Sequence, residues 1–115
     1  MEVGIDIEQN DRFKTVSENF IKRAFTKNEI EFAKKFKNSH EQYCSFWCVK
    51  EAVVKAFSNR KLCFQDIEIS ATKEGRPFIV LNDTIKAELE KAGAKEIKIS
   101  ISHSKEFSTA ICIIN

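Results

Sequence analysis

The chain has 115 residues, 43% of them apolar and 31% charged, which favours one globular domain spanning residues 1–115. A formal net charge of +2 is too small to indicate a nucleic-acid partner. No apolar run reaches the ~18 residues that a membrane span requires, and the first residues do not resemble a signal peptide. We therefore expect a cytoplasmic protein without membrane association, whose four cysteines are reduced thiols.

The first half of the chain predicts one strand followed by helices. Apolar and polar residues alternate over residues 3–8, which is typical of a strand. Apolar residues recur at helical spacing from about 10 to 21. Thr26, with a glutamate three residues later, resembles a capping box that opens a helix over residues 26–36. The longest helix is expected over residues 39–58.

The second half predicts short strands around one helix. A Gly-Arg-Pro turn between two β-rich stretches indicates a hairpin, and Gly93 is placed to stop a helix. The expected elements are a strand at 64–71, a turn at 74–77, a strand at 78–81, a helix at 83–92, and strands at 97–101 and 107–114. This order predicts an α+β fold with a largely antiparallel sheet packed against helices.

Asp6 is the first candidate for chemistry. Aspartate is depleted inside strands, yet Asp6 lies between two isoleucines and shares a strand face with Gly4 and Glu8. Two carboxylates beside a glycine would form half of a site for a hard cation. A solvent-exposed polar strand face is the alternative at this point.

Glu51 and Lys55 lie one turn apart on the long helix, opposite its broad apolar face. A surface ion pair, worth about 0.2–0.5 kcal/mol, is the simplest interpretation. However, Trp47 and Val54 flank Glu51, so the helix is apolar nearly all round. A charged pair among apolar neighbours favours the wall of a cleft over open water.

His103 falls where a predicted strand meets its turn, among Ser102, Ser104 and Lys105. A histidine at such a place can donate to a phosphate or transfer a proton, although a structural role is also open. Taken together, Asp6 and Glu51 could hold a magnesium ion while a lysine and a histidine offset phosphate charge. This combination predicts phosphoryl-type transfer.

Basic residues gather in the first quarter of the chain, where they predict a face for an acidic protein or phosphate groups. They are Arg12, Lys14, Lys22, Arg23 and Lys27. Arg60 and Lys61 follow the long helix and are further candidates for phosphate contacts.

Several motifs in this order resemble the holo-acyl-carrier-protein synthase family, the short type of 4'-phosphopantetheinyl transferase. They are GIDIE at residues 4–8 with Arg12-Phe13, VKEAVVKAF at 49–57, the FQDIEI stretch at 64–69, Gly75-Arg-Pro77, ISISHS at 99–104 and the closing strand at 107–114. The resemblance covers nearly the whole chain.

The resemblance implies Mg²⁺-dependent transfer of 4'-phosphopantetheine from coenzyme A to a serine of an acyl carrier protein, with release of 3',5'-ADP. It also implies roles for particular residues. Asp6 and Glu51 match the metal-binding carboxylates, Lys55 and His103 match residues that meet the coenzyme A phosphates, and Arg12 matches a carrier-protein contact. Family members commonly form trimers with active sites at subunit boundaries. The sequence leaves open which carrier protein is served.

The chain departs from the family pattern at two places. Phe46 and Trp47 stand where members often carry a basic residue, and the loop at residues 58–62 lacks the usual glycine. One alternative is therefore a non-catalytic module of the same fold that only binds a carrier protein. A second alternative is a transition-metal site formed by His40, Cys44, Cys48 and Cys63, although the spacing is unlike that of familiar zinc sites.

Overall fold

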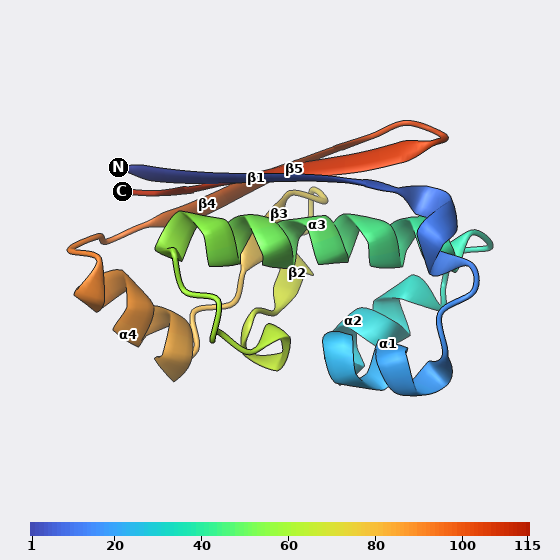
Figure 1. Cartoon of the computed structure of the whole chain (residues 1–115), viewed down its shortest axis with the longest axis horizontal. Helices are drawn as coiled ribbons and strands as arrows, with labels where there is room; N and C mark the ends of the chain where they lie inside the picture. Colours follow the sequence, from blue (N-terminus) through green and yellow to red (C-terminus); the bar gives the residue numbers. More distant parts are fainter.

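The computed structural model describes all residues 1–115 as a three-stranded antiparallel sheet, a two-stranded hairpin and four α-helices (Figure 1). The larger sheet has the order β1–β5–β4, and the smaller one pairs β2 with β3. The elements are β1 Glu2–Gln9, η1 Asn10–Phe13, α1 Glu18–Ala24, α2 Lys27–Ala33, α3 Ser39–Phe57, η2 Phe64–Asp66, β2 Ile69–Ala71, β3 Pro77–Ile79, α4 Asp83–Lys91, β4 Ile97–His103 and β5 Phe107–Ile114. The predicted α+β class is confirmed. No helix combines the length and apolar character needed to cross a membrane.

Helix α3 lies along one face of the larger sheet, and α1, α2 and α4 lie on the other side of α3 (Figure 1). The β2–β3 hairpin passes behind α3 and reaches β4. Gly4 allows β1 to touch this helix. A Cβ atom on Gly4 would lie 1.9 Å from the Ala52 carbonyl oxygen and 2.7 Å from the Ala56 amide nitrogen. No side chain fits in that space, so glycine at this position sets the distance between β1 and α3.

Strand register decides which residues of β1 face the helix. Gly4, Asp6 and Glu8 pair with residues 112, 110 and 108 of β5, which are all buried under α3. The alternate residues of β1 face away from the helix, because successive side chains of a strand point to opposite faces. These outward residues are Val3, Ile5 and Ile7, whose exposed fractions are 52%, 60% and 62%.

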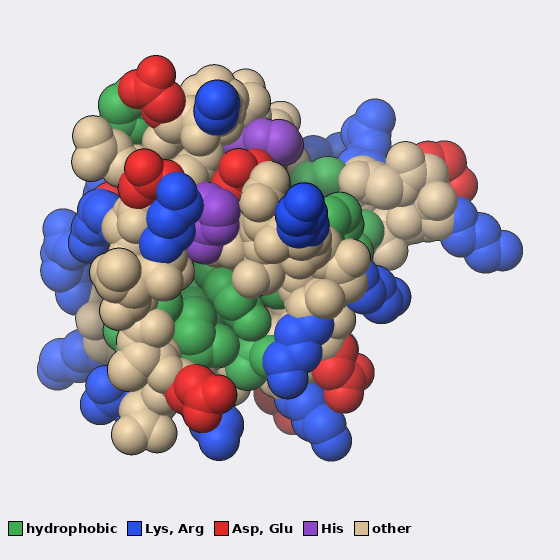
Figure 2. All heavy atoms as spheres, turned by 90° about the vertical axis from the view of Figure 1, so that its right-hand side faces the viewer, with side chains coloured by type: hydrophobic (Ala, Val, Ile, Leu, Met, Phe, Trp, Pro, Cys, Tyr) green, Lys and Arg blue, Asp and Glu red, His purple; other side chains and the backbone are tan.

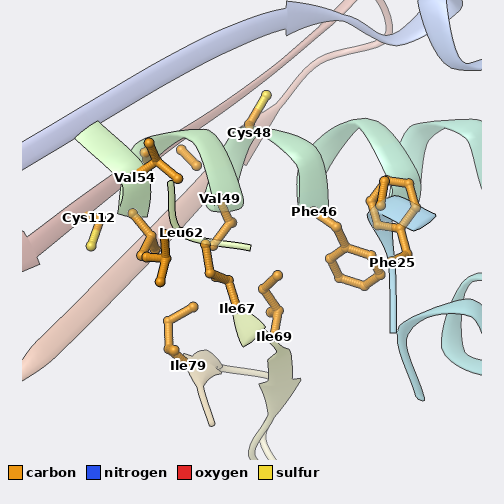
Figure 3. Packing of buried hydrophobic residues seen from close by; sticks show 14 of the residues in the cluster. Phe25, Phe46, Cys48, Val49, Val54, Leu62, Ile67, Ile69, Ile79 and Cys112 are labelled. Carbon is orange, nitrogen blue, oxygen red and sulfur yellow. The ribbon is translucent and has the colours of Figure 1, made fainter. Parts of the chain in front are cut away.

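The main core lies beneath α3, on the side away from the larger sheet (Figure 3). Val49 of α3 packs among aliphatic residues of the hairpin region, and Phe46 packs beside Phe25 with ring centroids 6.5 Å apart. On the sheet side, Cys48 and Cys112 are fully buried. Burial of each large apolar side chain stabilises the fold by about 1.5–3 kcal/mol. Packing on two sides leaves the edge of α3 beside β1 less covered, and Glu51 and Lys55 lie there.

A fully buried ion pair lies in the same core. Lys50 Nζ is 2.8 Å from Glu29 Oε1, and both side chains are 0% exposed. Lys50 also donates to the carbonyl oxygens of Phe64 and Ile67 at 2.8 and 2.6 Å. Burial lowers the pKa of Lys50, and the Glu29 carboxylate opposes that shift. The second Glu29 oxygen accepts from the Ile69 amide at 2.8 Å, so the pair ties α2, α3 and β2 together.

Three predicted boundaries differ from the structure. The helical stretch at 10–21 divides into η1 and α1, because Ser17 caps a new helix by accepting from the Phe20 amide. The predicted capping box forms, but α2 ends at Ala33 rather than near residue 36. The predicted strand at 64–71 forms only at Ile69–Ala71. Its first part is the 3-10 helix η2. The carbonyl oxygens of Phe64 in η2 and of Ile67 just after it accept hydrogen bonds from Lys50.

Candidate active site at the edge of strand β1

Asp6 and Lys55 meet where β1 crosses α3. Lys55 Nζ lies 3.3 Å from Asp6 Oδ1 and donates to the Ile5 carbonyl oxygen at 2.9 Å. The Asp6 side chain is 10% exposed, and the Lys55 side chain is 40% exposed. The other carboxylate oxygen, Asp6 Oδ2, is buried and has no hydrogen-bond partner. A buried anionic oxygen without a partner costs free energy unless a cation or a donor reaches it.

Glu8 extends this acidic surface one step along the same face of β1. Burial raises the pKa of Glu8, and the neighbouring Asp6 carboxylate raises it further. Arg12 pairs with Glu8 and acts in the opposite direction. Strand alternation had placed Glu8 beside Asp6 on this face as the second carboxylate of a possible cation site, and the structure keeps the two on the same face of β1.

Glu51 lies one turn before Lys55 on the same side of α3 and is partly buried. Lys55 makes no ion pair with Glu51, because its ammonium group reaches across to Asp6 instead. The simple surface-pair interpretation therefore fails. Glu51 makes no ion pair of its own in the structure.

The donor set fits a magnesium ion better than a closed metal cage. No three side chains of His, Cys, Asp or Glu converge as a complete site, whereas magnesium is usually held by one or two carboxylates together with waters and substrate phosphates. Asp6, with its partnerless oxygen, is one such carboxylate, and Glu51 is the candidate that the sequence offers for the second. The alternative cysteine site is wrong. Cys44 and Cys48 donate to the carbonyl oxygens of Glu8 and Ser108, and Cys63 is exposed outside the helix.

His103 lies at the far edge of the larger sheet. It ends β4, and β5 lies between β4 and β1, which separates the two edges by about 10 Å at the usual strand spacing. His103 lines a groove of about 710 Å³ between α2, α3, the hairpin and β4, together with Gln42, Ser45 and Phe46. Asp6, Glu51 and Lys55 do not line this groove. Asp6 and His103 therefore lie at separate places on one chain.

The basic residues predicted to bind partners lie on exposed surface. Arg12 is in η1, and Lys14 follows it and pairs with Asp11 at 3.2 Å. Lys22 and Arg23 lie in the last turn of α1. Figure 2 looks at this end of the molecule, where blue Lys and Arg side chains surround the purple histidines and an apolar hollow.

Arg60 and Lys61 are exposed just after α3, beyond Ser58. Ser58 adopts the left-handed conformation at φ 53°. A glycine would adopt this conformation without strain.

Comparisons with known proteins agree on one family. The model of the 4'-phosphopantetheinyl transferase superfamily matches residues 2–112. The chain is 39% identical to the holo-[acyl-carrier-protein] synthase of Caldicellulosiruptor bescii over 96% of this chain and 94% of that protein. It is 33% identical to the fatty acid synthase subunit alpha of Candida parapsilosis over 96% of this chain but only 6% of that protein.

Solved structures show the same arrangement of elements. The holo-(acyl-carrier-protein) synthase of Bacillus anthracis, solved with CoA (3',5'-ADP), matches 98% of this chain and 94% of that chain, with a TM-score of 0.82 at 29% identity. The Helicobacter pylori enzyme, solved with coenzyme A, covers 98% of this chain and 99% of that chain, with a TM-score of 0.81 at 28% identity. The fold is thus the phosphopantetheinyl transferase fold that the sequence predicted. The chain belongs to the 4'-phosphopantetheinyl transferase superfamily and, within it, to the holo-[acyl-carrier-protein] synthases, which are enzymes.

Proposed function

We propose that this enzyme transfers 4'-phosphopantetheine from coenzyme A to a serine of an apo acyl carrier protein, releases 3',5'-ADP and requires Mg²⁺. The observation that carries the proposal is the buried, partnerless Asp6 Oδ2 beside Lys55. This oxygen suits a divalent ion that arrives with the substrate pyrophosphate. The solved relatives with bound coenzyme A support the choice of substrate.

In this mechanism the side chains position the substrate and neutralise its charge. Asp6 and Glu51 would hold the ion, which supplies charge neutralisation at the pyrophosphate. Lys55 is free to turn its half-exposed ammonium group towards a phosphate. The carrier serine oxygen forms a bond to the phosphorus that bears the pantetheine arm, and the bond from that phosphorus to the 3',5'-ADP oxygen breaks. The serine proton passes to a carboxylate, for which Glu51 is our candidate.

Two chains are needed to complete the site in this proposal. Asp6 and His103 lie at opposite edges of one sheet, and in this proposal coenzyme A lies between Asp6 of one chain and His103 of its neighbour. Such a contact joins different surfaces of the two chains, which gives a closed ring when the rotation between neighbours is a whole fraction of a turn. The exposed apolar residues Val3, Ile5 and Ile7 supply surface for association. We propose a homotrimer, as the family resemblance implies.

The partner and the setting complete the proposal. The exposed Arg12, Lys14, Lys22 and Arg23 form a basic end that suits an acidic carrier protein, and Arg60 and Lys61 would add phosphate contacts at the end of α3. The relationship to fatty acid synthase subunit alpha supports a role in fatty acid biosynthesis. All four cysteines are free thiols, which agrees with a cytoplasmic location.

Intact-mass spectrometry of an apo carrier protein tests the reaction directly. The carrier is incubated with the enzyme, coenzyme A and Mg²⁺, and we expect a mass gain of one phosphopantetheine group on the carrier serine, together with free 3',5'-ADP. The gain should disappear with Asp6→Ala or with excess chelator. Carrier binding without any mass gain would overturn the proposal in favour of the non-catalytic binding module.

The ring is tested separately by a charge on the outward face of β1. Ile5→Glu should give monomers by light scattering, since the charge would be buried in the contact. Transfer should fall with it, while circular dichroism stays unchanged. A fully active monomer would rule out a site shared between chains.

The assignment of the base is tested by Glu51→Gln at saturating Mg²⁺. General-base catalysis contributes about 10²–10⁴-fold, so kcat should fall by at least about a hundredfold. Near-normal turnover would reassign the base.

A further inference from the structure

Three polar side chains are buried beneath the turn that joins β4 to β5. We call them the Asn10 network: Asn10, Ser45 and Ser108, with exposed fractions of 0%, 7% and 0%. Ser108 Oγ donates to Asn10 Oδ1 at 2.6 Å, and Ser45 Oγ lies 3.1 Å from Ser108 Oγ. The network therefore joins the end of β1 to α3 and β5.

Asn10 also holds the turn itself. Its amide nitrogen Nδ2 donates to the carbonyl oxygens of Ser104 and Lys105, both at 3.0 Å. Its backbone amide donates to the carbonyl oxygen of Glu106 at 2.8 Å. Asn10 thus contacts every residue of the turn, and each polar atom of its side chain has a partner.

His103 is linked to this network through the backbone. It precedes Ser104 in the chain, and it pairs with Ser108 across the β4–β5 ladder. Directly paired residues share a sheet face, so the His103 side chain lies on the face of Ser108. Ser45 and His103 line the same groove. The network therefore fixes the backbone before and opposite the histidine.

The network does more than fill space, because it supplies donors to carbonyl oxygens of the turn. Three buried polar groups lose their hydration on folding, and only complete hydrogen bonding offsets that cost. A satisfied polar network instead selects one conformation of the groups that it joins. Here the selected group is the turn that carries His103. Asn10 and Ser108 are themselves fully buried and cannot meet a substrate.

We propose that Asn10 is a positioning residue for coenzyme A binding: through Ser108 and the β4–β5 turn, it fixes the orientation in which His103 meets a phosphate of coenzyme A. This inference rests on the proposed function, because His103 acts there as a phosphate ligand. It adds a residue that connects η1, at the basic end, with His103 on the far edge of the sheet.

The test compares Asn10→Ala with wild type in the assembled enzyme, using coenzyme A, Mg²⁺ and apo carrier protein. We expect the Kd and KM for coenzyme A to rise about tenfold, because a displaced His103 would lose its hydrogen bond to the phosphate. The KM for the carrier and kcat should stay within about twofold. Ser108→Ala, which removes only the bridging hydroxyl, should raise the same two constants by a smaller factor.

Two controls separate positioning from general destabilisation. Asn82→Ala removes an asparagine whose side chain makes two comparable hydrogen bonds far from the turn, accepting from the Ile85 amide to cap α4 and donating to the Asp66 carbonyl oxygen. It should leave the Kd for coenzyme A unchanged. In a His103→Ala background, Asn10→Ala should cause no further rise, because the two residues act in series. Equal, additive effects in both backgrounds, or an unchanged Kd in Asn10→Ala, would overturn the inference. The Kd is measured by calorimetry, so a protein that binds coenzyme A but does not transfer it would overturn the proposed function and leave this test valid.

Discussion

Helix α3 carries two ion pairs, five residues apart, that lie in opposite circumstances. Lys50 and Glu29 are both fully buried, and the polar atoms around them have partners. Lys55 and Asp6 lie at the β1 edge, where Lys55 is 40% exposed and one Asp6 oxygen is buried without a partner. A pair with complete hydrogen bonding holds the fold together, whereas a pair with an unmet oxygen is available to a ligand. The hydrogen bonds around each pair therefore distinguish the ion pair that stabilises the fold from the one that is available for chemistry.

The largest expected effect breaks the structural pair. Lys50→Met leaves the Glu29 carboxylate buried without its cation, which should lower the free energy of unfolding by about 3–5 kcal/mol. Urea unfolding followed by circular dichroism measures it. Adding Glu29→Gln should recover part of the loss, because the uncompensated charge is gone. A Lys50→Met variant as stable as wild type would show that this ion pair does not stabilise the fold.

The second prediction breaks the other pair. Asp6→Asn should lower kcat/KM by about a hundred- to a thousandfold, since a metal-binding carboxylate is lost. The free energy of unfolding should stay the same or rise, because the buried anionic oxygen is replaced by a neutral group. Steady-state kinetics and urea unfolding are measured on the same preparation. If Asp6→Asn loses both stability and activity, the Asp6–Lys55 pair also stabilises the fold, and the two pairs do not differ as argued.

The third prediction uses pH. The pKa of Glu8 is raised by burial and by Asp6, so the folded state binds this proton more tightly than the unfolded state. The contribution of Glu8 to stability is therefore present at acid pH and is lost as pH rises through the raised pKa. Without added metal, Glu8→Gln should raise Tm slightly at pH 7, and the gain should shrink towards pH 4. A Tm difference that is constant over this range would contradict the assignment.

The smallest expected effect lies outside both pairs, at the end of the same helix. Ser58 adopts φ 53°, where glycine avoids a steric cost. Ser58→Gly should raise the free energy of unfolding by about 0.5–1 kcal/mol and leave kcat unchanged. Ser58→Ala serves as the matched control, since it keeps the Cβ atom. A large change in kcat would show that this turn takes part in the reaction.

Much of the fold follows from local patterns in the sequence. Strand alternation predicts β1, β4 and β5, and the Thr26–Glu29 capping box marks the start of α2. The 3-10 helix at Phe64–Asp66 could not be predicted, because its carbonyl groups turn towards Lys50, a residue 14 positions earlier. Local propensity contains no such long-range contact.

The site was predictable residue by residue but not as an arrangement. Asp6, Glu51 and Lys55 stand out in the sequence, yet helical spacing pairs Lys55 with Glu51 and not with Asp6. The observed contact depends on how closely β1 crosses α3. The position of His103 at the opposite sheet edge depends on strand order, and the Asn10 network joins residues up to 98 positions apart.

Gly4 links the packing of β1 on α3 to the position of Asp6 in the candidate active site. Any side chain there would strike the α3 backbone, so a substitution must push the strand off the helix and carry Asp6 away from Lys55 in the same movement. Asp6 and Lys50 can each be altered to change one property alone, but residue 4 cannot. For anyone engineering this enzyme, position 4 offers no route to trade stability against turnover.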